Sequence, residues 1–158
     1  HNLFAGAIMA DSKIRQIAEA IKSKIAVSYA GETSALDMSN KVAIGAVVEP
    51  PYIPFASVVF VQSTSDYGQT LGRYRITANF EVYAFVGGAD VTERTLNAMD
   101  LTSDMIKALT ADRQLGIPSI VDDIKCAFTA EDGDRYGIEG AGIGYIQIEV
   151  FYQTDTGS

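Results

Sequence analysis

The sequence has few of the residue types on which catalysis and metal binding most often depend. Its 158 residues include one cysteine, Cys126, one histidine, His1, and no tryptophan. A lone histidine at the first position excludes a histidine-based catalytic triad and a metal site with several histidine ligands. One cysteine excludes an internal disulfide and a zinc site made of cysteines. Because phosphate-binding loop and nucleophile-elbow motifs are also missing, we expect no enzyme, no cofactor and no metal.

Long apolar runs are missing as well. No run approaches the ~18 consecutive apolar residues of a membrane helix, so we expect no membrane partner. Cys126 lies in an apolar stretch, and we expect it to pack as a small hydrophobic side chain rather than to act as a nucleophile.

Basic residues are scarce, and they are unevenly distributed. The formal net charge is -8, from 12 basic and 20 acidic residues. Residues 1–48 hold five basic and four acidic groups, so residues 49–158 hold seven basic against sixteen acidic groups, a net charge of -9. Tight DNA binding needs clustered Lys and Arg, so this balance argues against it. An acidic wall along which DNA slides without being held remains compatible with the charge.

The chain length fits one domain, which we expect to span residues 9–158. Met9 followed by Ala10 and Asp11 looks like a natural start, and we expect residues 1–8 to be left from an expression vector.

Two segments have helical periodicity. Residues 11–29 place Ile14, Ile17, Ile21 and Ile25 on one stripe, with Asp11 or Ser12 as the N-cap. Residues 90–109 form the second helix, which Asp90 begins with Glu93 three residues later in a capping-box pattern.

The remaining elements are strands and connections. We predict strands over residues 42–48, 56–63, 73–86 and 141–154, and a polar hairpin loop over 63–72. Residues 119–129 are ambiguous, with a strand favoured over 124–129, and residues 130–140 form an acidic turn region. The order αβββαββ predicts an α+β fold, with a mainly antiparallel or mixed sheet and two helices packed on it.

The predicted core is the set of apolar residues that share one face of these elements. It comprises Ile14, Ile17, Ile21 and Ile25 of the first helix, Met105, Ile106 and Leu109 of the second, and Ile76, Phe80, Val82, Ile148 and Val150 of the sheet.

Three clusters suggest chemistry, but each has a simpler explanation. Glycines at 137, 140, 142 and 144 precede a strand rather than a helix, so they indicate a turn and the start of a strand, not a dinucleotide loop. The acidic residues around Gly133 lack the spacing of a calcium loop and indicate a solvated turn. Nothing in the sequence brings Asp122 and Asp123 to Glu139 as an acid/base set.

Aromatic residues occupy the sheet face opposite the predicted core. Tyr83 and Phe85 alternate with Phe80 and Val82, and Tyr145 and Phe151 alternate with Ile148 and Val150. A sheet face turned to water is normally polar, so a second cover is expected. A partner chain or internal loops could supply it, and the sequence leaves both alternatives open.

The order of these elements carries a resemblance to a known family. The N-terminal amphipathic helix, the crossing with Pro50, Pro51 and Pro54, the long strand RYRITANFEVYAFV, the helix begun by Asp90, and the closing strand GYIQIEVFYQT follow one another. Nearly the whole chain from Met9 resembles the tail-terminator and tail-completion (neck) proteins of long-tailed bacteriophages. The resemblance rests on element order and strand character rather than on a diagnostic motif.

The resemblance implies a structural virion protein without catalytic residues. Such a subunit forms a ring, expected to be a hexamer, that caps the tail tube, ends its growth and joins it to the head connector. The implied partners are further copies of the chain, the tail tube protein and a connector or stopper protein, while DNA passes through without tight binding. The implied location is the neck of the virion, after assembly in the bacterial cytoplasm.

The candidate site residues follow from the family and from the charge pattern. Partner contacts are assigned to the hairpin loop and the aromatic face: Thr64, Ser65, Asp66, Tyr67, Gly68, Gln69, Thr70, Tyr83 and Phe85. The acidic residues expected to face the channel are Asp122, Asp123, Glu131, Asp132 and Asp134. For each of these the alternative is an ordinary solubilising surface charge.

Two other functions stay open. The chain could be a different neck or tail ring protein, such as a head–tail connector or a tube subunit, although two well-formed helices argue against the tube subunit. A small-ligand-binding or enzymatic α+β domain is the alternative from another class, and the lack of histidine and of a phosphate loop argues against it.

Overall fold

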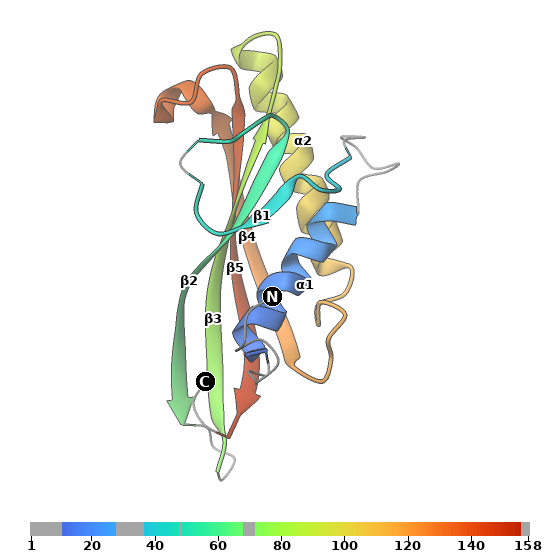
Figure 1. Cartoon of the computed structure of the whole chain (residues 1–158), viewed down its shortest axis with the longest axis vertical. Helices are drawn as coiled ribbons and strands as arrows, with labels where there is room; N and C mark the ends of the chain where they lie inside the picture. Colours follow the sequence, from blue (N-terminus) through green and yellow to red (C-terminus); the bar gives the residue numbers. More distant parts are fainter. Residues whose placement is uncertain (1–10, 28–36, 48, 68–71, 156–158) are drawn as a thin grey trace, which may run out of the picture.

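The computed structural model describes residues 11–27, 37–47, 49–67 and 72–155, in which a mixed five-stranded sheet carries two α-helices on one face (Figure 1). The fold is therefore α+β, as the sequence predicts. The elements follow in the order α1 (Lys13–Val27), β1 (Val42–Ile44), β2 (Phe55–Tyr67), β3 (Tyr74–Val86), α2 (Val91–Thr110), β4 (Val121–Asp132), the short 3-10 helix η2 (Gly133–Tyr136) and β5 (Gly142–Thr154). The predicted order αβββαββ fits this arrangement approximately, because η2 was not expected.

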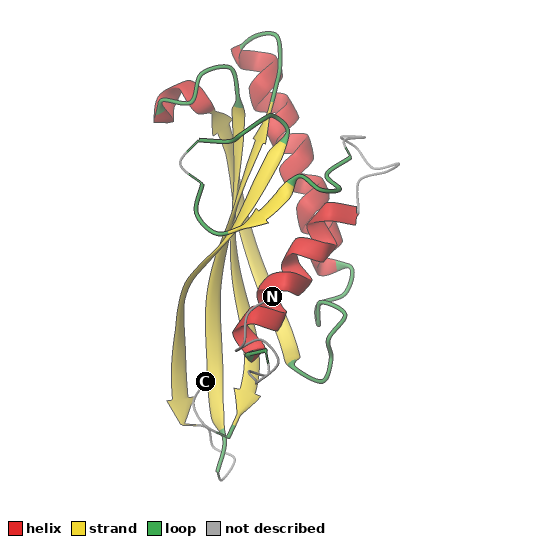
Figure 2. Cartoon of the chain, viewed as in Figure 1, coloured by secondary structure: helices red, strands yellow, loops and turns green. Residues whose placement is uncertain are grey.

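The strands lie in the spatial order β1-β2-β3-β5-β4. The short β1 pairs with β2 in parallel, and all other neighbouring strands are antiparallel. At the centre of the sheet Phe80 of β3 lies opposite Ile148 of β5. Figure 2 shows the strongly twisted sheet with β2, β3 and β5 extending beyond the region that the helices cover.

Both helices form where the sequence predicts them, because each has a cap and an apolar stripe. The Ser12 hydroxyl accepts a hydrogen bond from the backbone N–H of Arg15 at 3.1 Å, which satisfies one free donor at the start of α1. The Asp90 carboxylate accepts one from the backbone N–H of Glu93 at 2.8 Å and caps α2. On α1 the side chains of Ile17, Ile21 and Ile25 are fully buried.

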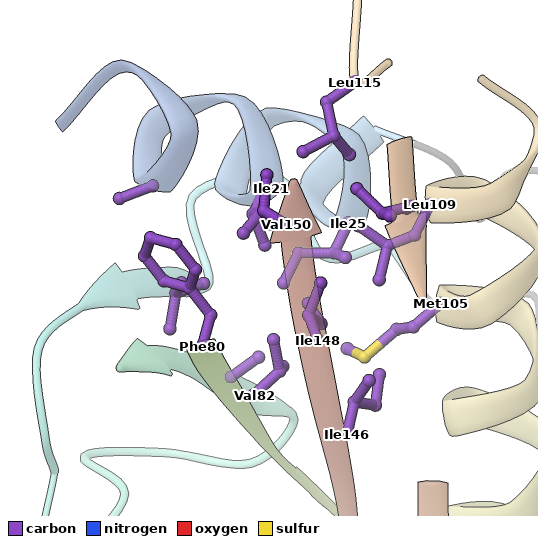
Figure 3. Packing of buried hydrophobic residues seen from close by; sticks show 14 of the residues in the cluster. Ile21, Ile25, Phe80, Val82, Met105, Leu109, Leu115, Ile146, Ile148 and Val150 are labelled. Atoms are coloured by element: carbon purple, nitrogen blue, oxygen red, sulfur yellow. The ribbon is translucent and has the colours of Figure 1, made fainter. Parts of the chain in front are cut away.

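The main core lies between these helices and one face of the sheet. Figure 3 shows Met105 and Leu109 of α2 and Ile21 and Ile25 of α1 directed toward the strand residues that alternate along β3 and β5. The predicted core is confirmed: ten of its twelve residues are buried, and Ile14 and Ile106 are partly buried against the same cluster. Strict alternation explains the success, since every second residue of a strand points to the same face.

Two glycines of β5 allow α2 to lie very close to the sheet. A Cβ atom at Gly142 would overlap the backbone oxygen of Arg94, and one at Gly144 would overlap the hydroxyl of Thr102. Gly144 is also flanked in the sheet by Ala84 and Ala130, so the sheet has only small residues at this point. The sequence places these glycines at the start of a strand; their packing role depends on α2, which the local pattern does not reveal.

Several predicted boundaries are corrected by the structure. The predicted hairpin loop 63–72 is wrong in its first half, because β2 continues to Tyr67 and pairs with β3 as far as Tyr74. The predicted strand 42–48 shrinks to Val42–Ile44. The ambiguous segment 119–129 is a strand that begins at Val121, and it continues through Asp132 into the predicted turn. Exposed polar residues can extend a strand when a neighbouring strand supplies their backbone partners, which a sequence pattern does not show.

A second, smaller apolar cluster lies on the other face of the sheet. Phe85 of β3, Phe55 of β2 and Ile143 of β5 are buried there, with Val47 and Ile138 partly buried against them. Val47 comes from the connection between β1 and β2, and Ile138 comes from the connection between η2 and β5. For Phe85 the cover is therefore internal, which decides between the two alternatives that the sequence left open.

Candidate functional site

The residues predicted to contact partners do not form one projecting loop. The side chains of Thr64, Ser65 and Asp66 are exposed, but they lie on β2 and are paired in the sheet. Tyr67 is the last residue of β2, opposite Tyr74. Gly68, Gln69 and Thr70 lie outside the described residues. What extends the sheet here is thus the paired ends of three strands, β2, β3 and β5, and not a long loop.

The outer edge of this extension is open. Strand β1 covers β2 only at Ala56, Ser57 and Val58. Among the described residues no strand pairs with the outer side of Phe60–Tyr67, although the other side of this segment pairs with β3. Phe60 is 44% exposed and Val61 is 49% exposed, at an irregularity in the register between Phe60 and Gln62. An edge with apolar side chains and free backbone groups is a template for another strand.

The opposite end of the sheet has a second open edge. Strand β4 pairs with β5 on one side, and within the described part of the chain no strand lies on its other side. Phe128 of β4 is 46% exposed beside this edge. Helix α2 packs on one face of β4, and the guanidinium of Arg113 donates a hydrogen bond to the backbone oxygen of Ile124 on β4 at 3.0 Å.

A cavity of about 370 Å³ lies on the sheet face opposite the helices. Its walls include three tyrosines, Tyr83, Tyr136 and Tyr145, together with Phe85 and Glu131. Tyr83 and Tyr145 lie opposite each other on β3 and β5, and their ring centroids are 5.1 Å apart at an interplanar angle of 48°. Predicted contact residue Tyr83 therefore lines a cavity, whereas Phe85 is only 3% exposed and forms part of its floor.

Two carboxylates bind the tyrosine hydroxyls around this cavity. Glu81 accepts a hydrogen bond from the Tyr83 hydroxyl at 2.9 Å and another from the Tyr145 hydroxyl. Glu131 accepts from the Tyr136 hydroxyl, and its other oxygen accepts from Arg135 at 3.1 Å. The sequence indicated that Glu81 and Tyr83 share a face, but it gave no signal for Tyr136, which η2 brings to the end of β4.

The pKa values of these tyrosines are displaced upward. Burial raises the pKa of Tyr83 to about 12, and the hydrogen bond to Glu81 adds to the effect. Burial also raises the pKa of Tyr145, again with the support of Glu81. For Tyr136 the main cause of a raised pKa is the hydrogen bond to Glu131. All three hydroxyls therefore remain protonated donors at neutral pH.

The five predicted channel residues lie at two ends of β4 rather than in one cluster. Asp122 and Asp123 are at its start, while Glu131, Asp132 and Asp134 are at its end and in η2. A strand rises by ~3.3 Å per residue, so the two groups are separated by roughly 25–30 Å. This separation also keeps Asp122 and Asp123 away from Glu139, which follows η2, so the structure does not assemble the acid/base set.

Most of these acidic side chains have a cationic partner. Arg94 lies 2.7 Å from Asp132 and 3.6 Å from Asp134. Arg113 contacts Asp123 at 2.6 Å. Hydrogen bonds from these arginines lower the pKa of Asp132 and of Asp123 below the ordinary carboxyl value. These pairings reduce the local negative charge, which weakens the case for an acidic channel wall at these positions.

Cys126, the one cysteine of the chain, is partly buried on β4. Burial raises the pKa of the Cys126 thiol to about 11, so it is protonated and unreactive at neutral pH, and it packs against the core as expected. No group of three or more His, Cys, Asp or Glu side chains within the described ranges could hold a metal ion. In the same part of the chain, no helix combines the length and apolar character needed to span a membrane.

The comparisons with known proteins add no family. Neither protein-family models nor curated proteins match the sequence.

Proposed function

We propose that this chain is a structural subunit of a bacteriophage tail that assembles with copies of itself into a ring, caps the tail tube and joins it to the head connector. The observation that carries the proposal is the pair of open sheet edges, on β2 and on β4, at opposite ends of one sheet. The resemblance in element order supplies the identity of the assembly.

Opposite edges favour a ring over a two-fold dimer. When the β2 edge of one subunit pairs with the β4 edge of the next, each contact uses two different surfaces. Such head-to-tail contacts continue until the rotation between subunits closes them into a ring. The exposed Phe60 and Val61 at one edge and Phe128 at the other are the apolar side chains that this contact would bury.

The charge of the chain supports passage of DNA without binding. A subunit of net charge -8 repeated around a ring repels the phosphate backbone at low ionic strength. Asp122 and Asp134 are exposed, and the ring orientation decides whether they face the channel. Asp123, Glu131, Asp132 and Asp134 contribute less to such a wall, because arginines partner them.

Substitutions at the edges test the assembly. Val61→Lys adds a charge that blocks strand pairing at the β2 edge. Val91→Lys is the matched control, because Val91 is 54% exposed but lies in the first turn of α2 and not on an edge strand. We expect native mass spectrometry and negative-stain imaging to detect closed rings for the natural sequence and for Val91→Lys, and single subunits for Val61→Lys.

Three outcomes would contradict the proposal. A chain that stays monomeric at high concentration and in the presence of tail tubes does not form the ring. Rings that neither cap tail tubes nor bind connector rings point to a different neck or tail protein. Tight binding of duplex DNA at physiological salt would contradict the repelling channel while leaving the ring intact.

A further inference from the structure

The cavity beside Tyr83 has features of a binding site that the ring does not need. It lies on the sheet face opposite the helices, near η2, and not at the open β2 edge. Its volume of about 370 Å³ lies within the range of small-ligand sites, which is ~300–1,000 Å³. Tyr136, at 59% exposure, keeps one side open to solvent, while Phe85 and Ile143 close the floor.

Aromatic rings dominate the walls. The rings of Tyr83 and Tyr145 are in contact and inclined to one another, and Tyr136 and Phe85 also line the same space. Tyrosine and phenylalanine faces carry negative charge density, so they attract a cation that lies within ~6 Å of the ring centre. Planar guanidinium groups also stack on such rings, which a compact ammonium cannot do.

The charged groups at the cavity are acidic. Glu131 lines it, and Glu81 lies just behind Tyr83 and Tyr145, holding both hydroxyls. None of the described residues that line the cavity is basic. Among the described residues, the one cation bonded to either carboxylate is Arg135, whose side chain is 75% exposed and outside the lining. An anion entering this space would meet two carboxylates of which only Glu131 has a basic partner, and a neutral apolar group would gain nothing from the carboxylates.

The remaining ligand class is a cation on an aliphatic stem. Val47, Ile138 and Ile143 offer apolar contact for methylene groups, while the tyrosine faces and Glu131 offer the charge complement. Arginine combines these parts: a three-carbon stem and a flat guanidinium that stays charged at any physiological pH. The net charge of -8 makes a basic polypeptide the electrostatically favoured partner.

We propose that this cavity receives an arginine side chain of a partner polypeptide, with the guanidinium against the tyrosine rings and paired with Glu131. The partner would then bind on the sheet face opposite the helices. This site is separate from the β2 and β4 edges that are used in ring formation. It stands whether or not the chain forms rings.

Three probes test the proposal on the whole chain by NMR, with the tyrosine ring signals assigned from Tyr→Phe variants. The first is the peptide Gly-Gly-Arg-Gly-Gly, the second is the same peptide with uncharged citrulline in place of arginine, and the third is free n-butylguanidinium. We expect the arginine peptide to shift the signals of Tyr83, Tyr136 and Tyr145 but not those of Tyr52, which lies outside the cavity. The citrulline peptide should bind at least tenfold more weakly.

Two charge-removing variants complete the test. Glu131→Gln should weaken binding of the arginine peptide about tenfold or more. Glu149→Gln is the matched control on the same sheet face, outside the cavity, and should leave the affinity within a factor of two. The proposal is overturned if the citrulline peptide binds equally well, if both variants behave alike, or if butylguanidinium binds while the arginine peptide does not. The last result would assign the cavity to a small free cation.

Discussion

Phe80 and Phe85 lie on the same strand, β3, and are almost equally buried, at 1% and 3% exposure, but they point to opposite faces of the sheet. Phe80 belongs to the large cluster between the sheet and the two helices. Phe85 belongs to a cluster of three buried residues that is closed by side chains from two connections. One face is thus covered by regular elements and the other by loops.

The difference between the two faces shows that the exposed fraction of a side chain does not by itself determine how much stability is lost when that side chain is truncated. Packed helices keep a fixed distance from the sheet. Truncating a side chain between a helix and the sheet therefore leaves a cavity that neighbouring side chains cannot fill. Connections such as the one that carries Val47 can move inward and fill part of the space. Equal exposure therefore predicts unequal energetic cost, and the same face that is loosely covered also contains the tyrosine cavity.

The largest expected effect is at Phe80. Phe80→Ala removes a ring from the centre of the helix-covered core, and we expect the free energy of unfolding to fall by about 3–5 kcal/mol. Chemical denaturation followed by circular dichroism measures the change. A loss below ~1 kcal/mol would show that this face does not form the core of the protein.

The matched substitution on the other face should cost less. For Phe85→Ala we expect a loss of about 2–3 kcal/mol, below that of Phe80→Ala, because the covering connections relax into the space. Both variants start from the same residue type and from nearly the same exposure. The difference between their losses in free energy of unfolding therefore measures how rigidly each face of the sheet is covered. Equal losses of stability in Phe80→Ala and Phe85→Ala would contradict this expectation and indicate that the connections are as rigid as the helices.

A third substitution tests the close approach of α2. Gly144→Ala places a methyl group against Thr102, and we expect a loss of about 1–3 kcal/mol as α2 shifts away from the sheet. Gly87→Ala is the control, since the nearest atom to its added Cβ is 3.8 Å away, an ordinary contact. The same denaturation measurement applies, and a tolerated Gly144→Ala would mean that α2 is not fixed by this contact.

The helix-covered face is the part of the fold that the sequence predicts well. The isoleucine spacing of α1 and the alternation along β3 and β5 are regular over ten or more residues, so their buried faces can be assigned without a structure. Where regularity ends, prediction fails. Residues Ser63–Asp66 are exposed on both sides of the sheet, so they show no alternation and resemble a loop, although β3 supplies their backbone partners.

The candidate site is predicted less well, for the same physical reason. Tyr83 belongs to the alternating pattern, and it was identified as a face residue. Tyr136 comes from the turn after β4, and only the three-dimensional path of η2 brings it to Tyr145 and Glu131. Likewise, the partnership of Arg94 with Asp132 joins α2 to β4 across 38 residues, so the predicted acidic cluster could not be known to be partly neutralised.

The smallest expected effect concerns the ionisation of Tyr83 on the loosely covered face. With a pKa of about 12 against an ordinary value of about 10, its hydroxyl keeps its proton in the folded state after the unfolded chain has lost it. Between these two pH values the folded state binds more protons, so stability falls as pH rises from about 10 to about 12. Near-ultraviolet difference titration against Tyr83→Phe should show one tyrosine ionising late. In Glu81→Gln the pKa should fall only part of the way, because burial is the larger cause and remains. An ordinary pKa for Tyr83 in the natural sequence would mean that this face is open to water, and the contrast with the helix-covered face would then be greater than the structure indicates.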